Sequence, residues 1–175
     1  MKRFILIFLL LNISLSAQTS GTLKWQKLIE CLPQMKKVSD FNIRELVGDN
    51  NPNAYIFLTY SCYDDPDYGF GGKSIIIEVI DCIDSKAYMN IMLSLDPKEV
   101  MLGSDPNFAE PILIKEKFQG TKTVEVYDSV ITKCRYAFKV ADRFLIMLTS
   151  NEGDFFKEMD LLINDFNFVK LEKLN

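Results

Sequence analysis

Residues 111–118 (PILIKEKF), 121–129 (TKTVEVYDS), 130–140 (VITKCRYAFKV) and 143–150 (RFLIMLTS) read as four strands, and residues 151–166 (NEGDFFKEMDLLINDF) read as a helix. The third strand alternates most clearly. Its apolar residues, such as Cys134 and Phe138, share one face, while basic residues, such as Arg135 and Lys139, share the other. A period of two residues is typical of a strand with one face in water. This part of the chain therefore predicts an antiparallel sheet with one wet face.

The last strand and the helix predict where the core lies. Residues 143–150 are apolar on both faces, which predicts a central strand with the helix covering one side. Ala141 and Asp142 form a candidate two-residue turn, although glycine is usual there. Asn151 is a candidate N-cap of the helix. One face of the helix is apolar and contains Phe155, Phe156, Met159, Leu162, Ile163 and Phe166.

The first half of the chain adds further elements. We expect strands at residues 54–61 (AYIFLTYS) and 73–81 (KSIIIEVID), and helices at residues 23–32 and 85–95. The strands are rich in β-branched and aromatic residues, and the helices carry apolar residues at helical spacing. Residues 34–53 and 96–107 read as irregular connections. The sequence predicts an α+β fold, with a twisted antiparallel sheet of about six strands and an N-terminal, a middle and a C-terminal helix packed on it.

The first 17 residues read as a secretory leader. Lys2 and Arg3 precede an apolar run at residues 4–11, and small residues before Ala17 offer cleavage after Ala17 or after Ser16. A membrane anchor is the competing interpretation, but the run is short of the ~20 apolar residues that span a bilayer. We expect a signal peptide at residues 1–17, a single α+β domain at residues 18–175, export to the periplasm or medium, and no stable membrane span after cleavage.

Composition excludes several classes of function. The chain has a net charge of −4, which becomes −6 when Lys2 and Arg3 leave with the leader. This balance argues against a nucleic-acid partner, because phosphates need a positive face. The chain has no histidine, so catalytic triads that use histidine and zinc sites that contain it cannot form. We identify no cofactor-binding motif and no catalytic motif.

The most unusual local composition is CYDDPDYGFGG at residues 62–72. Three acids suggest a site for a hard cation such as calcium, but the EF-hand spacing is missing, which favours a solvated hairpin tip. Aromatic residues in the same loop suggest a tip that binds protein or glycan, although they can equally fold back onto the sheet edge. The candidate binding residues are Tyr63, Asp64, Asp65, Asp67, Tyr68 and Phe70.

Two acids and four cysteines complete the candidate sites. Catalysis without histidine would need a carboxylate such as Glu78 or Asp81 in a pocket, but strand-end and surface roles explain these acids more simply. Export would permit disulfides, and three pairings of two bonds are open to Cys31, Cys62, Cys82 and Cys134. No C-x-x-C spacing occurs, and Cys62 and Cys82 would lie at opposite ends of a hairpin. We therefore favour free cysteines.

Short motifs run through most of the mature chain. They are LIECLP (residues 28–33), AYIF (54–57), IEVID (77–81), KEKFQG (115–120), ADRF (141–144) and LEKL (171–174). Together they resemble a loose family of small exported bacterial proteins without established activity, whose pattern does not include the loop at residues 62–72. The resemblance implies an α+β sandwich similar to the Mog1/PsbP type. It supplies no catalytic residues.

These observations predict an exported, non-catalytic domain that binds a partner in the cell envelope, through the loop at residues 62–72 or an exposed face of the sheet. The alternative is a small hydrolase based on carboxylates, or a protein that binds a lipid or another small molecule.

Overall fold

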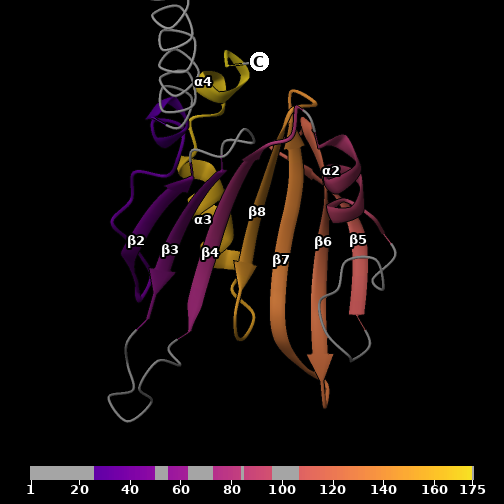
Figure 1. Ribbon diagram of the computed structural model, residues 1–175. Helices are drawn as coiled ribbons and strands as arrows, with labels where there is room; N and C mark the ends of the chain where they lie inside the picture. The colour runs from indigo at the N-terminus through magenta and orange to yellow at the C-terminus, as the bar shows by residue number, and fades with distance from the viewer. Residues whose placement is uncertain (1–25, 50–54, 63–72, 84, 96–106, 175) are drawn as a thin grey trace, which may run out of the picture.

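The computed structural model describes residues 26–49, 55–62, 73–83, 85–95 and 107–174. Eight strands in these ranges form one sheet in the order β1-β2-β3-β4-β8-β7-β6-β5 (Figure 1). Every pair of neighbouring strands is antiparallel. The strands are β1 (Lys37–Val38), β2 (Phe41–Asp49), β3 (Tyr55–Ser61), β4 (Ser74–Asp81), β5 (Asn107–Ile114), β6 (Phe118–Tyr127), β7 (Val130–Val140) and β8 (Phe144–Ser150).

The sheet consists of two four-stranded meanders. Strands β1 to β4 follow one another in space as in sequence, and so do β5 to β8. The two meanders meet where β4 pairs with β8, with Ile77 opposite Leu148. Antiparallel neighbours need only short connections, so this junction is the one place where strands distant in sequence must find each other.

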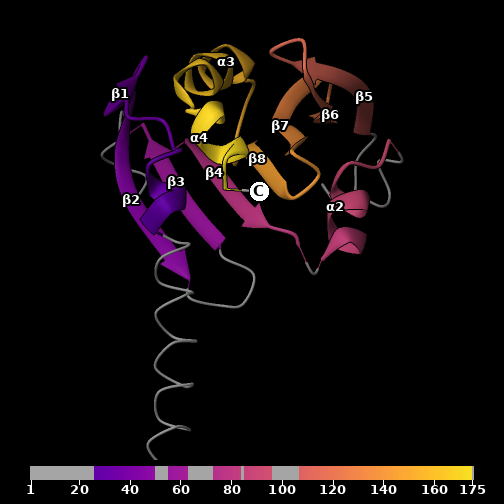
Figure 2. The ribbon, with the colours of Figure 1, turned by 90° about the horizontal axis from the view of Figure 1, so that it is seen from above.

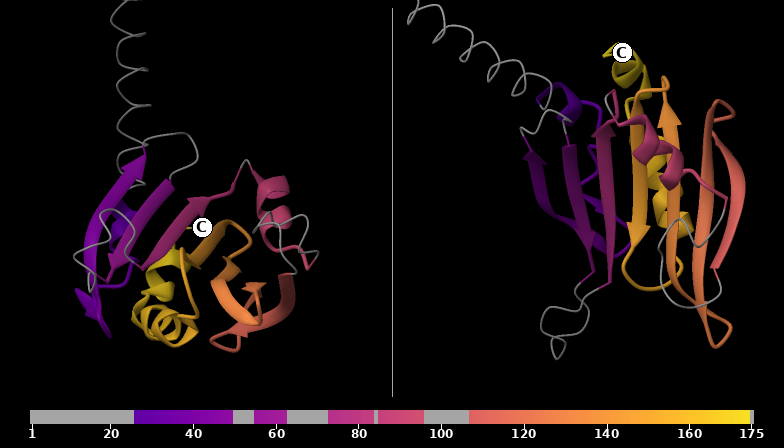
Figure 3. Two further views of the ribbon diagram at one scale, coloured as in Figure 1. Left: turned by 90° about the horizontal axis from the view of Figure 1, so that it is seen from below. Right: turned by 45° about the vertical axis from the view of Figure 1, so that its right-hand side comes forward.

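The sheet curves, and its two faces are covered differently. Helices α3 (Phe156–Asp165) and α4 (Phe168–Glu172) lie on the concave face, and α2 (Lys86–Met92) lies on the convex face (Figure 2). Figure 3 shows the same arrangement from two further directions. The large core fills the concave side. A small apolar cluster between α2 and the sheet contains Cys82, Met89, Ala137, Leu145 and Met147.

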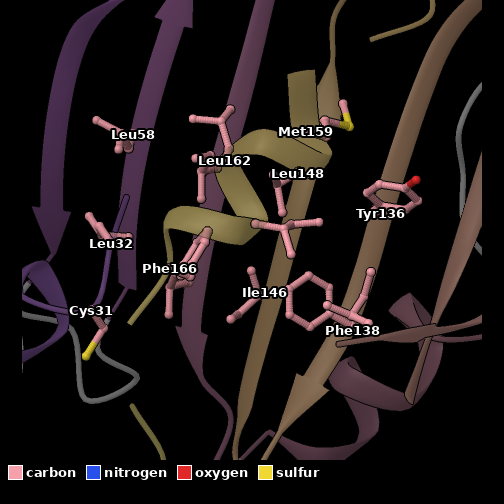
Figure 4. Packing of buried hydrophobic residues seen from close by; sticks show 14 of the residues in the cluster. Cys31, Leu32, Leu58, Tyr136, Phe138, Ile146, Leu148, Met159, Leu162 and Phe166 are labelled. Atoms are coloured by element: carbon pink, nitrogen blue, oxygen red, sulfur yellow. The ribbon is translucent and has the colours of Figure 1, made fainter. Parts of the chain in front are cut away.

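Helix α3 packs on the centre of the sheet, as its apolar face predicts. Met159, Leu162 and Ile163 are buried. Figure 4 shows Met159 and Leu162 together with Leu148 of the central strand β8. Burying each such side chain stabilises the fold by roughly 1.5–3 kcal/mol. The position of β8 between β4 and β7 confirms the prediction of a central strand, because its apolar side chains are covered on both faces.

The predicted sheet of about six strands with three helices is wrong. Strands β1 and β2 lie in the segment predicted to be irregular, and β5 begins at Asn107, four residues before the predicted strand. Strand β2 lacked a clear pattern for two reasons. Its side chains from Asn42 to Val47 are exposed on both faces, and an irregularity between Ile43 and Glu45 shifts its alternation.

The helices also differ from prediction. The described N-terminal helical turn covers residues 26–29, and the C-terminal helix is broken into α3 and α4 where Phe166 takes an extended conformation. Asn151 does not cap α3, because its Oδ1 accepts a hydrogen bond from the Ser74 N–H at 2.6 Å. The side chain of Asn167 caps α4 instead. No helix within the described ranges has the length and apolarity needed to cross a bilayer.

Helix α2 is shorter and less buried than predicted. Ser85 precedes it as expected, but its side chain makes no capping hydrogen bond, and Met89 is the buried residue of the helix. Tyr88 and Ile91, expected to face the core, are exposed. The reason is that this helix is apolar on more than one side, so that spacing alone does not identify the face that meets the sheet.

Three hairpins turn without glycine. Both central residues have positive φ at Lys115–Glu116, Asp128–Ser129 and Ala141–Asp142. This geometry defines a type I′ turn, which matches the twist of the flanking strands. The Arg143 N–H donates to the Val140 carbonyl at 3.2 Å. A turn therefore forms at Ala141 and Asp142 as predicted, but the loop has three residues and not two, because Val140 pairs with Phe144.

Candidate functional site

The outer edge of β2 is a candidate binding surface. Strand β2 pairs with β3 along its length. The two-residue strand β1 pairs with its outer side at Phe41 and Asn42, and the Ile43 N–H donates to the Lys36 carbonyl at 2.9 Å. No other strand in the described part of the chain pairs with that side. The segment of β2 beyond Arg44, residues 45–49, is called the open edge below. In an edge strand, backbone N–H and C=O groups point outward and can pair with another chain.

Apolar side chains flank the open edge on both faces of the sheet. Leu46 pairs with the buried Leu58, and Val47 pairs with Phe57 on the convex face. Both Leu46 and Val47 are exposed. An incoming strand would therefore find apolar contacts above and below the hydrogen-bonding edge.

The opposite edge of the sheet, β5, is built differently. It also exposes large apolar side chains, Phe108 and Leu113. However, it contains Pro111, which has no N–H to donate to another strand. Proline is a common device that blocks pairing at sheet edges. The two edges are therefore not equivalent, and β2 is the better template for another strand.

A second candidate site lies on the convex face next to α2. Arg135 is only 5% exposed, and one of its terminal nitrogens, Nη1, contacts the Met92 sulfur at 3.8 Å. Burial lowers the pKa of Arg135 to about 10, against the influence of Tyr88 and Glu78. Tyr55 donates a hydrogen bond to Glu78 Oε1 at 2.9 Å. Burial and the Glu78 carboxylate raise the pKa of Tyr55 well above its ordinary value.

Sequence reasoning missed Arg135. Its strand alternates cleanly, so that Arg135 was expected on the wet face with Lys139. Its side chain does project from that face, but α2 covers the face locally, and Met89 and Met92 of α2 lie over it. One signal was available: the neighbouring strand carries Thr121 and Thr123, which are short polar residues suited to a covered polar surface.

The two candidate carboxylates, Glu78 and Asp81, do not come together. They lie three residues apart on β4 and therefore project from opposite faces of the sheet. Glu78 is on the convex face, half-buried beside Tyr55. Asp81 is on the concave side, 1% exposed. This placement gives no support to a hydrolase that would use both acids.

Asp81 forms a buried ion pair with Arg143. Its Oδ1 accepts from Arg143 Nε at 2.9 Å and its Oδ2 accepts from Nη2 at 2.7 Å. Arg143 Nη1 donates to the Leu174 carbonyl at 2.7 Å, so the pair ties the sheet to the end of α4. A pocket of about 290 Å³ adjoins the pair and is lined by Lys27, Leu28, Asp81, Arg143, Phe144, Lys173 and Leu174.

The predicted binding loop lies outside the described residues. This applies to Tyr63, Asp64, Asp65, Asp67, Tyr68 and Phe70. The loop prediction therefore stays a prediction.

No disulfide joins the four cysteines. Cys62 follows the end of β3 and Cys82 follows the far end of β4, as expected for a hairpin. Cys31, Cys82 and Cys134 are buried, and burial raises the pKa of each thiol, that of Cys31 to about 11. Buried thiols with raised pKa values are poor nucleophiles, so these three residues act as small core residues.

No known protein family, curated protein or solved structure matches this chain. The resemblance to small exported bacterial proteins and to the Mog1/PsbP type therefore stays a prediction.

Proposed function

We propose that this chain is an exported, non-catalytic binding domain of the cell envelope, and that it binds an extended segment of a protein partner along the open edge of β2. The observation that carries the proposal is the length of β2 left without a partner strand. The last five residues of β2, 45–49, pair with β3 alone among the described strands.

The hydrogen-bonding pattern of the edge favours an extended peptide as the occupant. Alternate residues of an edge strand present both an N–H and a C=O outward, and only another extended backbone satisfies them in register. Addition of a strand to a sheet edge is a recurrent mode of peptide recognition. Backbone pairing provides affinity in this mode, and side-chain contacts provide specificity.

The side chains that flank the open edge indicate which residue types the partner segment would carry. Leu46 and Val47 project from opposite faces of the sheet, each beside an apolar residue of β3. A peptide that alternates across the same edge would place its side chains against both. We therefore expect a partner segment of about four to six residues with apolar or β-branched residues on both faces.

Export is part of the proposal and rests on the pattern of residues 1–17. We expect the mature protein, isolated from the envelope of the source cell, to begin at Gln18, or at Ala17 if cleavage follows Ser16. Mass spectrometry of the intact protein measures this directly. Recovery of an uncleaved chain would contradict export through a cleaved leader.

The binding edge can be tested by site-specific crosslinking in envelope extracts. A photoreactive phenylalanine analogue is placed at position 46 on β2 or, as a matched control, at position 113 on β5. We expect position 46 to crosslink to a single partner protein within one short segment, and position 113 not to do so. Adding Val47→Lys should abolish the crosslink, because it replaces an apolar side chain that would contact the incoming strand with a charged one.

Two outcomes would overturn this assignment. One is a partner that crosslinks equally from positions 46 and 113. The other is a crosslink from position 46 only to a second copy of this chain, which would make the open edge a site of self-association. Sedimentation of the purified protein distinguishes that case, because self-pairing gives a dimer that Val47→Lys returns to a monomer.

A further inference from the structure

Arg135 is a buried cation whose hydrogen bonds are incomplete. It lies beneath α2 with 5% of its surface exposed. Among the described residues, its Nε and Nη2 atoms have no hydrogen-bond partner, and Nη1 contacts the weak acceptor Met92 Sδ at 3.8 Å. Buried charges in proteins are nearly always paired, because an unpaired charge loses its hydration without compensation.

The nearby acids do not neutralise Arg135. Glu78 acts on it at a distance, but the Glu78 carboxylate makes its hydrogen bond with Tyr55. Glu125 lies on the neighbouring strand two residues beyond the residue opposite Arg135. Its Oε2 is 3.2 Å from Lys133 Nζ but accepts no hydrogen bond within the described part of the chain. Among the described residues, no carboxylate forms an ion pair with Arg135.

Arg143 shows the same two donor atoms, Nε and Nη2, with their hydrogen bonds made. Its Nε and Nη2 donate to the two oxygens of Asp81 at 2.9 and 2.7 Å. These two nitrogens lie on one side of a guanidinium, and their spacing matches the two oxygens of a carboxylate or phosphate. In Arg135 the same pair of donors is unpartnered. The spacing of these two donors matches an oxyanion with two adjacent oxygens.

Two hydroxyl groups lie on the neighbouring strand, on the same face of the sheet as Arg135. Thr123 lies directly opposite Arg135 in the register of β6 and β7, and Thr121 lies opposite Ala137 on the same face. They are 1% and 3% exposed, and the Oγ1 atom of each has no hydrogen-bond partner. A threonine hydroxyl can donate to an anion, so a charged donor and two neutral donors, all buried, share one face of two paired strands.

We propose that Arg135, with Thr121 and Thr123, forms a binding site for a small oxyanion on the convex face beneath α2. The anion is a free carboxylate or phosphate, or such a group at the end of a larger ligand. It accepts two parallel hydrogen bonds from Nε and Nη2 of Arg135 and further bonds from the threonine hydroxyls. This site is separate from the open edge of β2 and independent of the proposed partner.

Helix α2 provides the entrance. It has seven residues, no side-chain cap and one buried residue, Met89. A short helix held by so little buried surface opens at low cost compared with the central strands. Met89 and Met92 are flexible side chains that can repack around a ligand. The anion therefore enters when α2 lifts.

Thermal unfolding with inorganic phosphate or acetate as the probe tests the site, with sodium chloride at matched ionic strength as the reference. A bound anion stabilises the native state in a saturable way, so that ligand at one hundred times its Kd raises the folding equilibrium constant about a hundredfold. General salt effects do not saturate at low concentration. We expect a saturable response to phosphate, acetate or both, and the responding anion identifies the chemistry.

Variants at the site complete the test. Arg135→Met should remove the saturable response and raise the melting temperature in chloride, because an uncompensated buried charge is replaced by an apolar chain. Lys139→Met removes a cation from the same strand and face, and this control should keep the full response. Should Arg135→Met not fold, Thr123→Val, which keeps the side-chain shape, should weaken anion binding about fivefold to tenfold.

The proposal is overturned if neither anion stabilises the native protein saturably. It is also overturned if Arg135→Met responds as the native protein does, or if Thr123→Val binds the anion with unchanged affinity.

Discussion

At the scale of single residues, the Asp81–Arg143 pair illustrates how burial sets the energetic cost of losing a partner. The side chains of Asp81 and Arg143 are 2% and 14% exposed. Removing one partner of a buried pair typically costs ~3–5 kcal/mol, because the other charge stays desolvated. We expect Asp81→Asn to lower the free energy of unfolding by about this amount, as measured by urea denaturation.

The matched control for this prediction is Asp142→Asn. Asp142 pairs with Lys139 at 2.6 Å, but its side chain is 79% exposed. Exposed pairs contribute at most about 1 kcal/mol, so this variant should be close to the native protein. An equal loss in the two variants would show that burial does not govern the strength of these pairs.

Ala141 is the residue at which glycine should improve the fold. Its φ of 54° lies in the left-handed region, where a Cβ atom costs ~1–2 kcal/mol and glycine does not have this cost. We expect Ala141→Gly to be more stable by about 1 kcal/mol, after the larger entropy of glycine in the unfolded chain is subtracted. The melting temperature should rise by about 2–4 °C. A lower melting temperature would contradict the type I′ turn.

At the scale of elements, α3 allows a comparison between neighbouring leucines. Leu162 is completely buried against the sheet, while Leu161 is exposed on the outer side of the same helix. Leu162→Ala should lower the free energy of unfolding by ~2–5 kcal/mol because it leaves a cavity in the core. Leu161→Ala should change it by less than about 1 kcal/mol. Similar losses in the two variants would refute the packing of α3.

The elements that could be predicted from the sequence are those with one buried face. Strand β7 and helix α3 each show the period of their own structure, since water contacts one side and the core the other. Strand β2 could not be predicted in this way. It is exposed on both faces and carries a bulge, so neither the core nor the alternation marks its residues. Tertiary pairing with β3 makes it a strand.

The candidate sites follow the same rule. The Asp81 and Glu78 carboxylates could be named from the sequence, but their separation across the sheet depends on the strand that holds both. Arg135 could not be identified, because its burial comes from α2, a helix that precedes it by more than forty positions in the chain. A period-two pattern reports which side of a strand a residue occupies, and it does not report what covers that side.

At the scale of the whole molecule, the buried thiols and phenols predict how stability depends on pH. Burial raises the pKa of Cys31 from 9.0 to about 11, and burial with a contribution from Asp165 raises that of Tyr60 from 10.0 to about 12. Both groups keep their protons in the native state at pH values where the unfolded chain has lost them. Their stabilising contribution is therefore complete below about pH 9 and is lost as the pH rises towards 12.

Urea denaturation between pH 8 and pH 11 measures this effect. The free energy of unfolding should fall over the alkaline part of this range, and Cys31→Ala should show a shallower fall between pH 9 and pH 11. The same slope in Cys31→Ala and in the native protein would contradict the raised pKa of this thiol.

The junction of β4 with β8 has a consequence for synthesis. Each meander can form from strands that are neighbours in sequence while the chain is being synthesised. Strand β4, however, has no partner on its second side until β8, which ends at Ser150, has been synthesised. Until then the nascent chain exposes the apolar side chains and unpaired backbone groups of β4, which can pair with a wrong strand. A chain shortened before Phe144 would stay permanently in that state, and aggregation rather than a smaller folded protein is its expected fate.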